Sequence, residues 1–196
     1  MAARNRLPPW HEQIRLSNGR EVLIRPIRPA DADPLRQGFA LLEPDEIRQR
    51  FLHAVRELTP EMADKLARPD AKREFALVAA EPLPPGEALV GAVARASITE
   101  SGREAEFAIL VSHYIAGLGL GRHLMRRLVR WAKGRRLERL CGDVLEHNQP
   151  MLALAQSLGF RREQTDEPGL VRVVLDLQPG RGTHAHDHDH DEPKAA

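Results

Sequence analysis

Cysteine is nearly absent from this chain, which has a single one, Cys141. One thiol forms no internal disulfide, and such sparing use is typical of proteins in a reducing cytoplasm. Long apolar runs are also missing: no stretch approaches the roughly 18 residues of a membrane span, and the N-terminal MAARNRLPPWHEQ lacks the apolar segment of a secretory signal. The chain also lacks a large net charge of either sign, since its formal net charge is +1. We therefore expect a cytoplasmic protein without a nucleic-acid or membrane partner.

The residues that are present suit one domain with a full core, because the chain has 196 residues of which 42% are hydrophobic. Composition predicts an N-terminal arm (1–19), a folded domain (20–178) and a C-terminal tail (179–196). Trp10 either packs on the folded domain and so attaches the arm to it, or is a surface residue without a structural role.

The tail is rich in histidine and aspartate and is expected to be disordered. Its histidines can bind Zn²⁺ or Ni²⁺ in vitro, but their spacing does not form a closed tetrahedral site. We assign no metal site there, and a metal-handling tail is the alternative. The histidines concerned are His184, His186, His188 and His190.

A strand, a glycine-rich turn and an amphipathic helix follow one another between residues 104 and 131. The apolar run 104–111 predicts the strand, and apolar residues recurring every four positions predict the helix. Backbone N–H groups at such a helix start can hold phosphate oxygens, although glycines there often make only a tight turn. The G-x-G-x-G spacing fits neither the dinucleotide fingerprint nor the mononucleotide loop. The glycines are Gly117, Gly119 and Gly121, and the apolar stripe is Leu120, Leu124, Leu128 and Ala132.

Further strands and helices are predicted on both sides of this unit. Thr59 and Asn148 are predicted N-caps, Gly134 is the predicted end of the long helix, and 100–102 is a hairpin turn. The other expected strands are 21–27, 75–80, 88–98, 137–145, 160–162 and 170–177. The other expected helices are 31–42, 45–53, 59–67 and 151–158.

Strand, link, glycine loop and helix together resemble the acetyl-CoA pyrophosphate loop of the GNAT N-acetyltransferases, Q/R-x-x-G-x-G/A. Here Gly119 and Gly121 match, whereas Ala116 stands where the family usually has Gln or Arg. Five further stretches extend the resemblance over residues 20–178, and they are most similar to the acetyltransferase domain of the bacterial Pat-type protein lysine acetyltransferases. These stretches are REVLIRPIRPADA, RQRFLHAVRELTPE, REAEFAILV, EHNQPMLALAQSLGF and LVRVVLDL.

The resemblance implies an α/β (α+β) fold of the GNAT type, with a mixed sheet of six to seven strands and helices on both faces. Two parallel strands, around residues 109–111 and Val144, should splay apart and hold acetyl-CoA as cosubstrate. An N–H of Val111 or a neighbour is the implied oxyanion donor, and Asn148 either only caps its helix or also lies near the pantetheine arm. The implied acetyl-CoA-binding residues are Ile109, Leu110, Val111, Ala116, Gly117, Leu118, Gly119, Leu120, Gly121, Arg122 and Asn148.

Acetyl transfer to an amine requires removal of a proton from the amine and polarisation of the thioester carbonyl. Glu106 lies in an apolar strand, where partial burial would suit a proton acceptor, and the resemblance assigns it the role of general base. The alternative interpretation is a partly exposed strand glutamate paired with an arginine such as Arg95 or Arg103. Glu104, on the same face of the strand, is the second candidate for the base.

The leaving thiolate has no evident proton donor in the sequence. Many GNAT members place a tyrosine four residues before the glycine of the Gly-Phe pair, where this chain has Ala155, and its only tyrosine is Tyr114. The thiolate therefore leaves unprotonated, takes a proton from water, or uses another group. Cys141 is interpreted as a core residue and His123 as a surface or phosphate-proximal residue.

The function implied by the resemblance is acetyl-CoA-dependent N-acetyl transfer by direct attack in a ternary complex. The implied acceptor is a protein lysine ε-amine. Two alternatives are open: acetylation of a small amine metabolite, and a sensor that binds acyl-CoA without catalysis.

Overall fold

The computed structural model describes residues 7–178, and within them the strands form one mixed sheet in the order β1-β2-β3-β4-β5-β6-β8-β7. All neighbouring strands pair antiparallel except β5 and β6, which run parallel. The strands are β1 Glu12–Arg15, β2 Glu21–Pro26, β3 Glu74–Ala80, β4 Val90–Ile98, β5 Glu104–Val111, β6 Arg139–Leu145, β7 Arg161–Glu163 and β8 Leu170–Asp176. The helices are α1 Ala32–Phe39, α2 Pro44–Phe51, α3 Pro60–Ala67, α4 Leu120–Gly134 and α5 Gln149–Ser157, with short 3₁₀ turns at Pro29–Asp31 and His113–Ile115.

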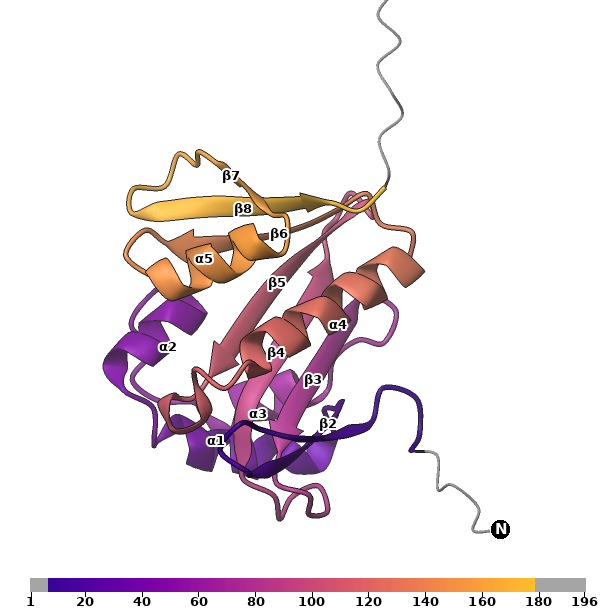
Figure 1. The fold of residues 1–196 in the computed structure, drawn as a ribbon. Coiled ribbons are helices and arrows are strands. Elements are labelled where there is room, and N and C mark those ends of the chain that lie inside the picture. The colour runs from indigo at the N-terminus through magenta and orange to yellow at the C-terminus, as the bar shows by residue number, and fades with distance from the viewer. Residues whose placement is uncertain (1–6, 179–196) are drawn as a thin grey trace, which may run out of the picture.

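Helices cover both faces of the sheet, as predicted. Helices α4 and α5 lie on one face, and α1, α2 and α3 lie on the other (Figure 1). The apolar stripe predicted for α4 is at most 1% exposed at each of its four residues, because this helix packs against the middle strands of the sheet. Thr59 and Asn148 cap α3 and α5, as their sequence positions predict.

The sheet of the described residues has eight strands, which exceeds the six to seven predicted, and β1 is the strand for which no range was predicted. It lies in the stretch predicted to be a loose arm. The Trp10 ring packs on Phe75 at 4.7 Å and on the Arg130 guanidinium at 4.3 Å, and Glu12 Oε2 accepts a hydrogen bond from Arg127 at 2.6 Å. These long-range contacts attach the arm to the body, which was one of the two alternatives for Trp10.

The first helix ends at Phe39 rather than near Leu42. The long helix ends at Gly134, as predicted, and the chain then turns with a positive φ at Arg136.

The parallel pair β5–β6 is short and then opens. Pairing covers only Glu104 with Arg139, Ala105 with Leu140 and Glu106 with Cys141, although both strands continue for several residues. Just beyond the last pair, the Phe107 ring of β5 lies over Gly142 of β6, where an added Cβ would be 2.7 Å from the ring. The strands are therefore splayed, as predicted.

Candidate active site

A cavity of about 650 Å³ lies where β5 and β6 separate. Its walls come from α2, β5, the loop before α4, the first turn of α4, β6 and the start of α5. The lining residues include Glu46, Arg50, Glu106, Ile109, Leu110, Val111, Gly117, Gly119, Gly121, Arg122, Asp143 and Asn148.

One edge of β5 faces this cavity. Residues 107–111 of β5 pair with β4 on one side, but none of them pairs with β6 on the other. Alternate backbone N–H and C=O groups on that edge are therefore free to bond an extended ligand, as at any open strand edge. Ile109, Leu110 and Val111, which are predicted to bind acetyl-CoA, all line the cavity.

The glycine loop supplies a second set of free donors. Gly117 and Gly119 have φ values of +74° and +83°, which side chains other than glycine disfavour. The first backbone bond into α4 runs from the His123 N–H to the Gly119 carbonyl at 3.2 Å, so the N–H groups of residues 120–122 have no partner within the helix. This arrangement fits the diphosphate of coenzyme A, because both the free N–H groups and the helix dipole favour an anion.

Two residues of the predicted acetyl-CoA loop, Leu118 and Leu120, can face a ligand only with their backbone. The side chain of Leu120 is 1% exposed, and that of Leu118 packs against the same core, so neither lines the cavity. Ala116 and Arg122 do line it. The Arg122 guanidinium donates to Ser157 Oγ at 2.7 Å, which holds it beside the start of α4.

Asn148 is the N-cap of α5, and it also lies at the cavity. Its Oδ1 accepts the Met151 N–H at 3.2 Å as the N-cap of α5, and the residue also lines the cavity. The cap bond fixes its orientation and leaves the side-chain amide nitrogen for a ligand.

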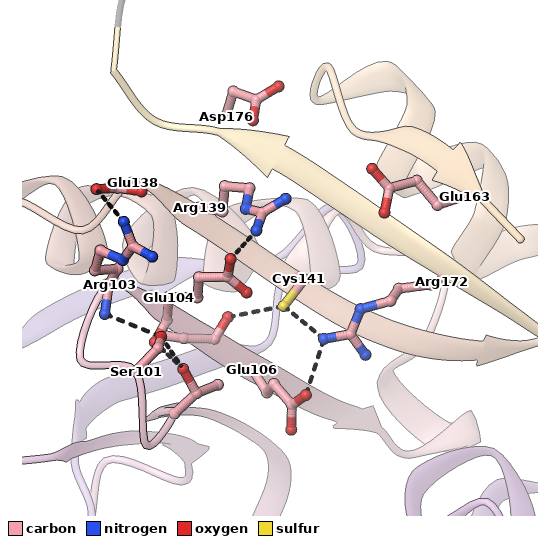
Figure 2. Close-up of polar contacts among 12 residues, drawn as sticks. Ser101, Arg103, Glu104, Glu106, Glu138, Arg139, Cys141, Glu163, Arg172 and Asp176 are labelled. Atoms are coloured by element: carbon pink, nitrogen blue, oxygen red, sulfur yellow. Dashed lines mark hydrogen bonds and ion pairs between the residues drawn. The ribbon is translucent and has the colours of Figure 1, made fainter. Parts of the chain in front are cut away.

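Glu106 lies at the wall of the cavity and is held by an arginine from β8. Arg172 Nη2 donates to Glu106 Oε1 at 2.9 Å and to the Cys141 sulfur at 3.1 Å (Figure 2). Its Nη1 reaches Asp143 at 3.1 and 3.2 Å. Burial lowers the pKa of Arg172, but the hydrogen bond to Glu106 and the charges nearby outweigh it and raise the pKa on balance.

Glu106 has the surroundings of the alternative interpretation, a partly exposed glutamate paired with an arginine. Its side chain is 54% exposed, because it points away from the apolar face that Phe107 joins. Its partner is neither of the arginines proposed from sequence: Arg95 pairs with Glu74 at 3.4 Å, and Arg103 lies 3.9 Å from Glu138.

The other candidate groups for the chemistry lie outside the cavity. Glu104 pairs with Arg139 (Figure 2). The Tyr114 hydroxyl donates to the Val90 carbonyl at 3.1 Å, and His123 Nε2 lies 2.9 Å from Glu12.

Cys141 is 1% exposed and belongs to the core, as predicted. Burial raises the pKa of its thiol to about 11, so the group stays protonated at neutral pH. A protonated, buried thiol is a poor nucleophile, and Cys141 does not line the cavity.

Helix α2 contributes a wall that the sequence interpretation missed. Glu46 accepts hydrogen bonds from the backbone N–H of His113 at 2.6 Å and from Glu43 N–H at 2.7 Å, which ties α2 to the segment after β5. Gln49, Arg50 and Leu52 complete this wall. The i, i+3 and i+4 spacing of residues 46, 49 and 50 was a readable signal of one polar helix face.

Among residues 7–178, no three His, Cys, Asp or Glu side chains are grouped so that they could hold a metal ion. The four tail histidines lie outside the described residues. In the same part of the chain, no helix is long and apolar enough to span a bilayer.

Known proteins are similar to this chain in sequence and in fold. The chain matches the family described as acetyltransferase (GNAT) domain over residues 21–161. It is 32% identical over 151 residues to acetyltransferase PA5475 of Pseudomonas aeruginosa, covering 77% of this chain and 80% of that protein. The GNAT domain of S. lividans PAT superposes with a TM-score of 0.76 at 24% identity, covering 88% of this chain and 100% of that one. A cAMP-binding acyltransferase from Mycobacterium smegmatis gives 0.58 at 24% identity, covering 86% of this chain and 48% of that one.

Diverging parallel strands, a glycine loop and these relatives define the class of the protein, which is an acyltransferase. More particularly, the chain belongs to the GNAT acetyltransferase family. Members of that family bind acyl-CoA and an acceptor amine, and the resemblance stated from sequence is confirmed at that level.

Proposed function

We propose that this protein transfers an acetyl group from acetyl-CoA to a primary amine, and that the amine is a protein lysine side chain. One observation carries the proposal: a single cavity joins the free N–H groups at the start of α4, the open edge of β5 and the Glu106 carboxylate. The three features correspond to the diphosphate, the pantetheine arm and the reacting amine.

The positions of the groups suggest how the substrates lie. The diphosphate binds the N–H groups of residues 117–122, and Arg122 adds a positive charge there. The pantetheine arm extends along residues 109–111 and pairs with their free backbone groups, with the Asn148 amide on the opposite wall. An N–H of the same edge, at Val111 or a neighbour, polarises the thioester carbonyl.

Glu106 is the proposed general base. In its ion pair with Arg172 the group is a carboxylate, which is the form that accepts a proton. It takes a proton from the amine, directly or through a water molecule, and the amine nitrogen forms its bond to the carbonyl carbon. The C–S bond then breaks, the thiolate leaves with the electron pair, and water supplies its proton, because Tyr114 is bonded elsewhere.

A lysine of another protein suits the acceptor side better than a fully enclosed metabolite. The Glu106 side chain is 54% exposed, so an amine at the end of a long side chain can reach it from outside. The sequence resemblance to the Pat-type domain supports the same acceptor.

The experiment measures thiol release from acetyl-CoA with lysine peptides and with small amines as acceptors. Glu106→Gln should lower kcat by roughly 10²–10⁴-fold, which is the usual contribution of a general base. Glu104→Gln is the matched comparison, since it removes a carboxylate two residues away that does not line the cavity.

Three outcomes contradict parts of the proposal. An unchanged rate in Glu106→Gln removes this residue from the mechanism, and a larger loss in Glu104→Gln moves the base there. Binding of acetyl-CoA without thiol release for any acceptor would instead indicate a sensor. Transfer to small amines but to no peptide would replace the lysine acceptor.

A further inference from the structure

Arg50 is a cavity-lining arginine whose guanidinium makes no ion pair or hydrogen bond with any residue in the described part of the chain. Its guanidinium contacts the Phe51 ring, with 4.9 Å between the guanidinium carbon and the ring centroid. That contact covers one face of the group but leaves its N–H edges without acceptors. Such a group, half-buried and unpaired, differs from the other charged residues around the cavity.

The carboxylates that could neutralise Arg50 are already engaged. Glu46 is one helical turn before it on α2, at the spacing of an i, i+4 pair, yet its oxygens bond His113 and the Glu43 N–H. Glu106 and Asp143 share Arg172.

A second cation makes the surroundings of Arg50 more positive. Arg50 and Arg95 line the same small side cavity of about 60 Å³. Burial, followed by the repulsion of Arg95, lowers the pKa of Arg50 to about 10. Keeping an unpaired, partly buried cation costs stability, and groups with such perturbed pKa values cluster at functional sites.

The register of the sheet relates Arg95, the cation nearest to Arg50 in this side cavity, to Glu106. Arg95 stands opposite Ala108, on the same face of the sheet as Glu106. Ala108 and Glu106 are two residues apart, or about 7 Å along a strand. The glycine loop lies beyond the other end of β5, so the diphosphate has its own donors and leaves Arg50 free.

We infer that Arg50 binds a carboxylate carried by one of the two substrates, so that the enzyme selects an anionic group near the transferred acyl group. The planar guanidinium matches a carboxylate with two parallel hydrogen bonds, which a lysine does not reproduce. The carboxylate comes either from the acyl chain of a dicarboxylic acyl-CoA or from an acidic group next to the acceptor amine. This inference rests on the proposed transfer function.

The test compares matched substrate pairs with the wild-type chain. The donor pair is succinyl-CoA and acetyl-CoA, and the acceptor pair is a lysine peptide with a neighbouring glutamate and the same peptide with glutamine. We expect kcat/KM to favour the carboxylate by roughly 10- to 100-fold in one pair, the range for a charge-assisted hydrogen bond. The pair that shows the preference identifies the source of the carboxylate.

Three variants assign the preference to Arg50. Arg50→Gln should remove the preference by lowering kcat/KM for the carboxylate substrate much more than for the neutral one, and Arg50→Lys should restore only part of it. Arg48→Gln is the matched control, because it makes the same change on an exposed position of the same helix. Arg50→Gln should also raise the melting temperature of the free protein, whereas loss of a merely structural arginine would lower it.

Several results would overturn the inference. Wild-type enzyme that transfers acetyl groups without preference in either pair contradicts it and leaves the proposed function intact. Equal losses for both members of a pair in Arg50→Gln, or a matching loss of affinity for coenzyme A itself, would assign Arg50 to the structure or to the nucleotide. The wild-type comparison decides the question even if Arg50→Gln does not fold. Absence of transfer to any amine would instead refute the proposed function.

Discussion

The contact between Phe107 and Gly142 gives the sharpest prediction about the cleft. A Cβ added at Gly142 would lie 2.7, 2.8 and 3.0 Å from three atoms of the Phe107 ring, closer than real Cβ contacts allow. The ring is 8% exposed and packs edge to face on Phe160 at 5.6 Å, so it can move away from Gly142 only by repacking or by entering the cavity. Gly142→Ala should therefore displace the ring or the strand on which it rests.

The expected cost follows from overpacking in a filled core. Inserting one methyl group there typically costs about 1–3 kcal/mol, and about 2 kcal/mol corresponds to a fall of roughly 4–8 °C in Tm for a domain of this size. Phe107 and Gly142 both line the cavity, so acetyl-CoA affinity should fall at least about tenfold as well.

The assay pairs thermal unfolding with acetyl-CoA titration. Gly134→Ala is the control, because no atom lies within 4 Å of its added Cβ and alanine stabilises a helix by roughly 0.5–1 kcal/mol relative to glycine. Phe107→Leu in the Gly142→Ala background removes the two closest ring atoms. The double variant should therefore recover part of the stability and of the affinity that Gly142→Ala loses, which is a favourable coupling between the two positions. If Gly142→Ala changes neither Tm nor affinity, the ring does not set the separation of β5 and β6.

Two further predictions concern buried groups away from the cleft. Asp31→Asn should lower the free energy of unfolding by about 3–5 kcal/mol, because it leaves the charge of Arg25 uncompensated where both side chains are at most 2% exposed. The control is Asp33→Asn at an 81% exposed carboxylate, which should lower it by under about 0.5 kcal/mol in the same urea titration. The Cys141 thiol ionises near 9 in the unfolded chain but near 11 when folded, so the unfolded state loses its proton first and stability should fall by at most about 2–3 kcal/mol between pH 9 and 11. Cys141→Ala should lack that part of the pH dependence, and equal slopes in both proteins would refute the assignment.

Local sequence signals predicted most of the fold because most elements carry their own pattern. The strand around Glu106 has the predicted bounds, and the Thr59 and Asn148 caps were readable from single residues and their neighbours. The extra strand β1 was not readable, because four residues without a strong pattern form a strand only when β2 and α4 hold them. Contacts such as Glu12 with Arg127 span more than 100 residues and leave no local signal.

The candidate site was predicted where it is built from contiguous motifs and missed where it depends on long-range contacts. The glycine loop and the strand edge are contiguous motifs, so their residues were identified. The Arg172 partner of Glu106 was missed, because it comes from β8, which is distant in sequence. Its side chain reaches Glu106 across β6, the strand that pairs with both β5 and β8. The wall from α2 was missed as well, because the position of Arg50 depends on how three short helices pack on the sheet.

The central claim is that one ligand, acetyl-CoA, bridges the glycine loop and the open edge of β5. The most direct measurement is a titration of the ¹⁵N-labelled protein with acetyl-CoA, followed through its backbone amide resonances. The account predicts the largest shifts at Gly117, Gly119, Gly121 and residues 109–111, with smaller shifts on β1 and β2. Saturable binding that leaves the loop amides unchanged, or an absence of binding, would contradict it.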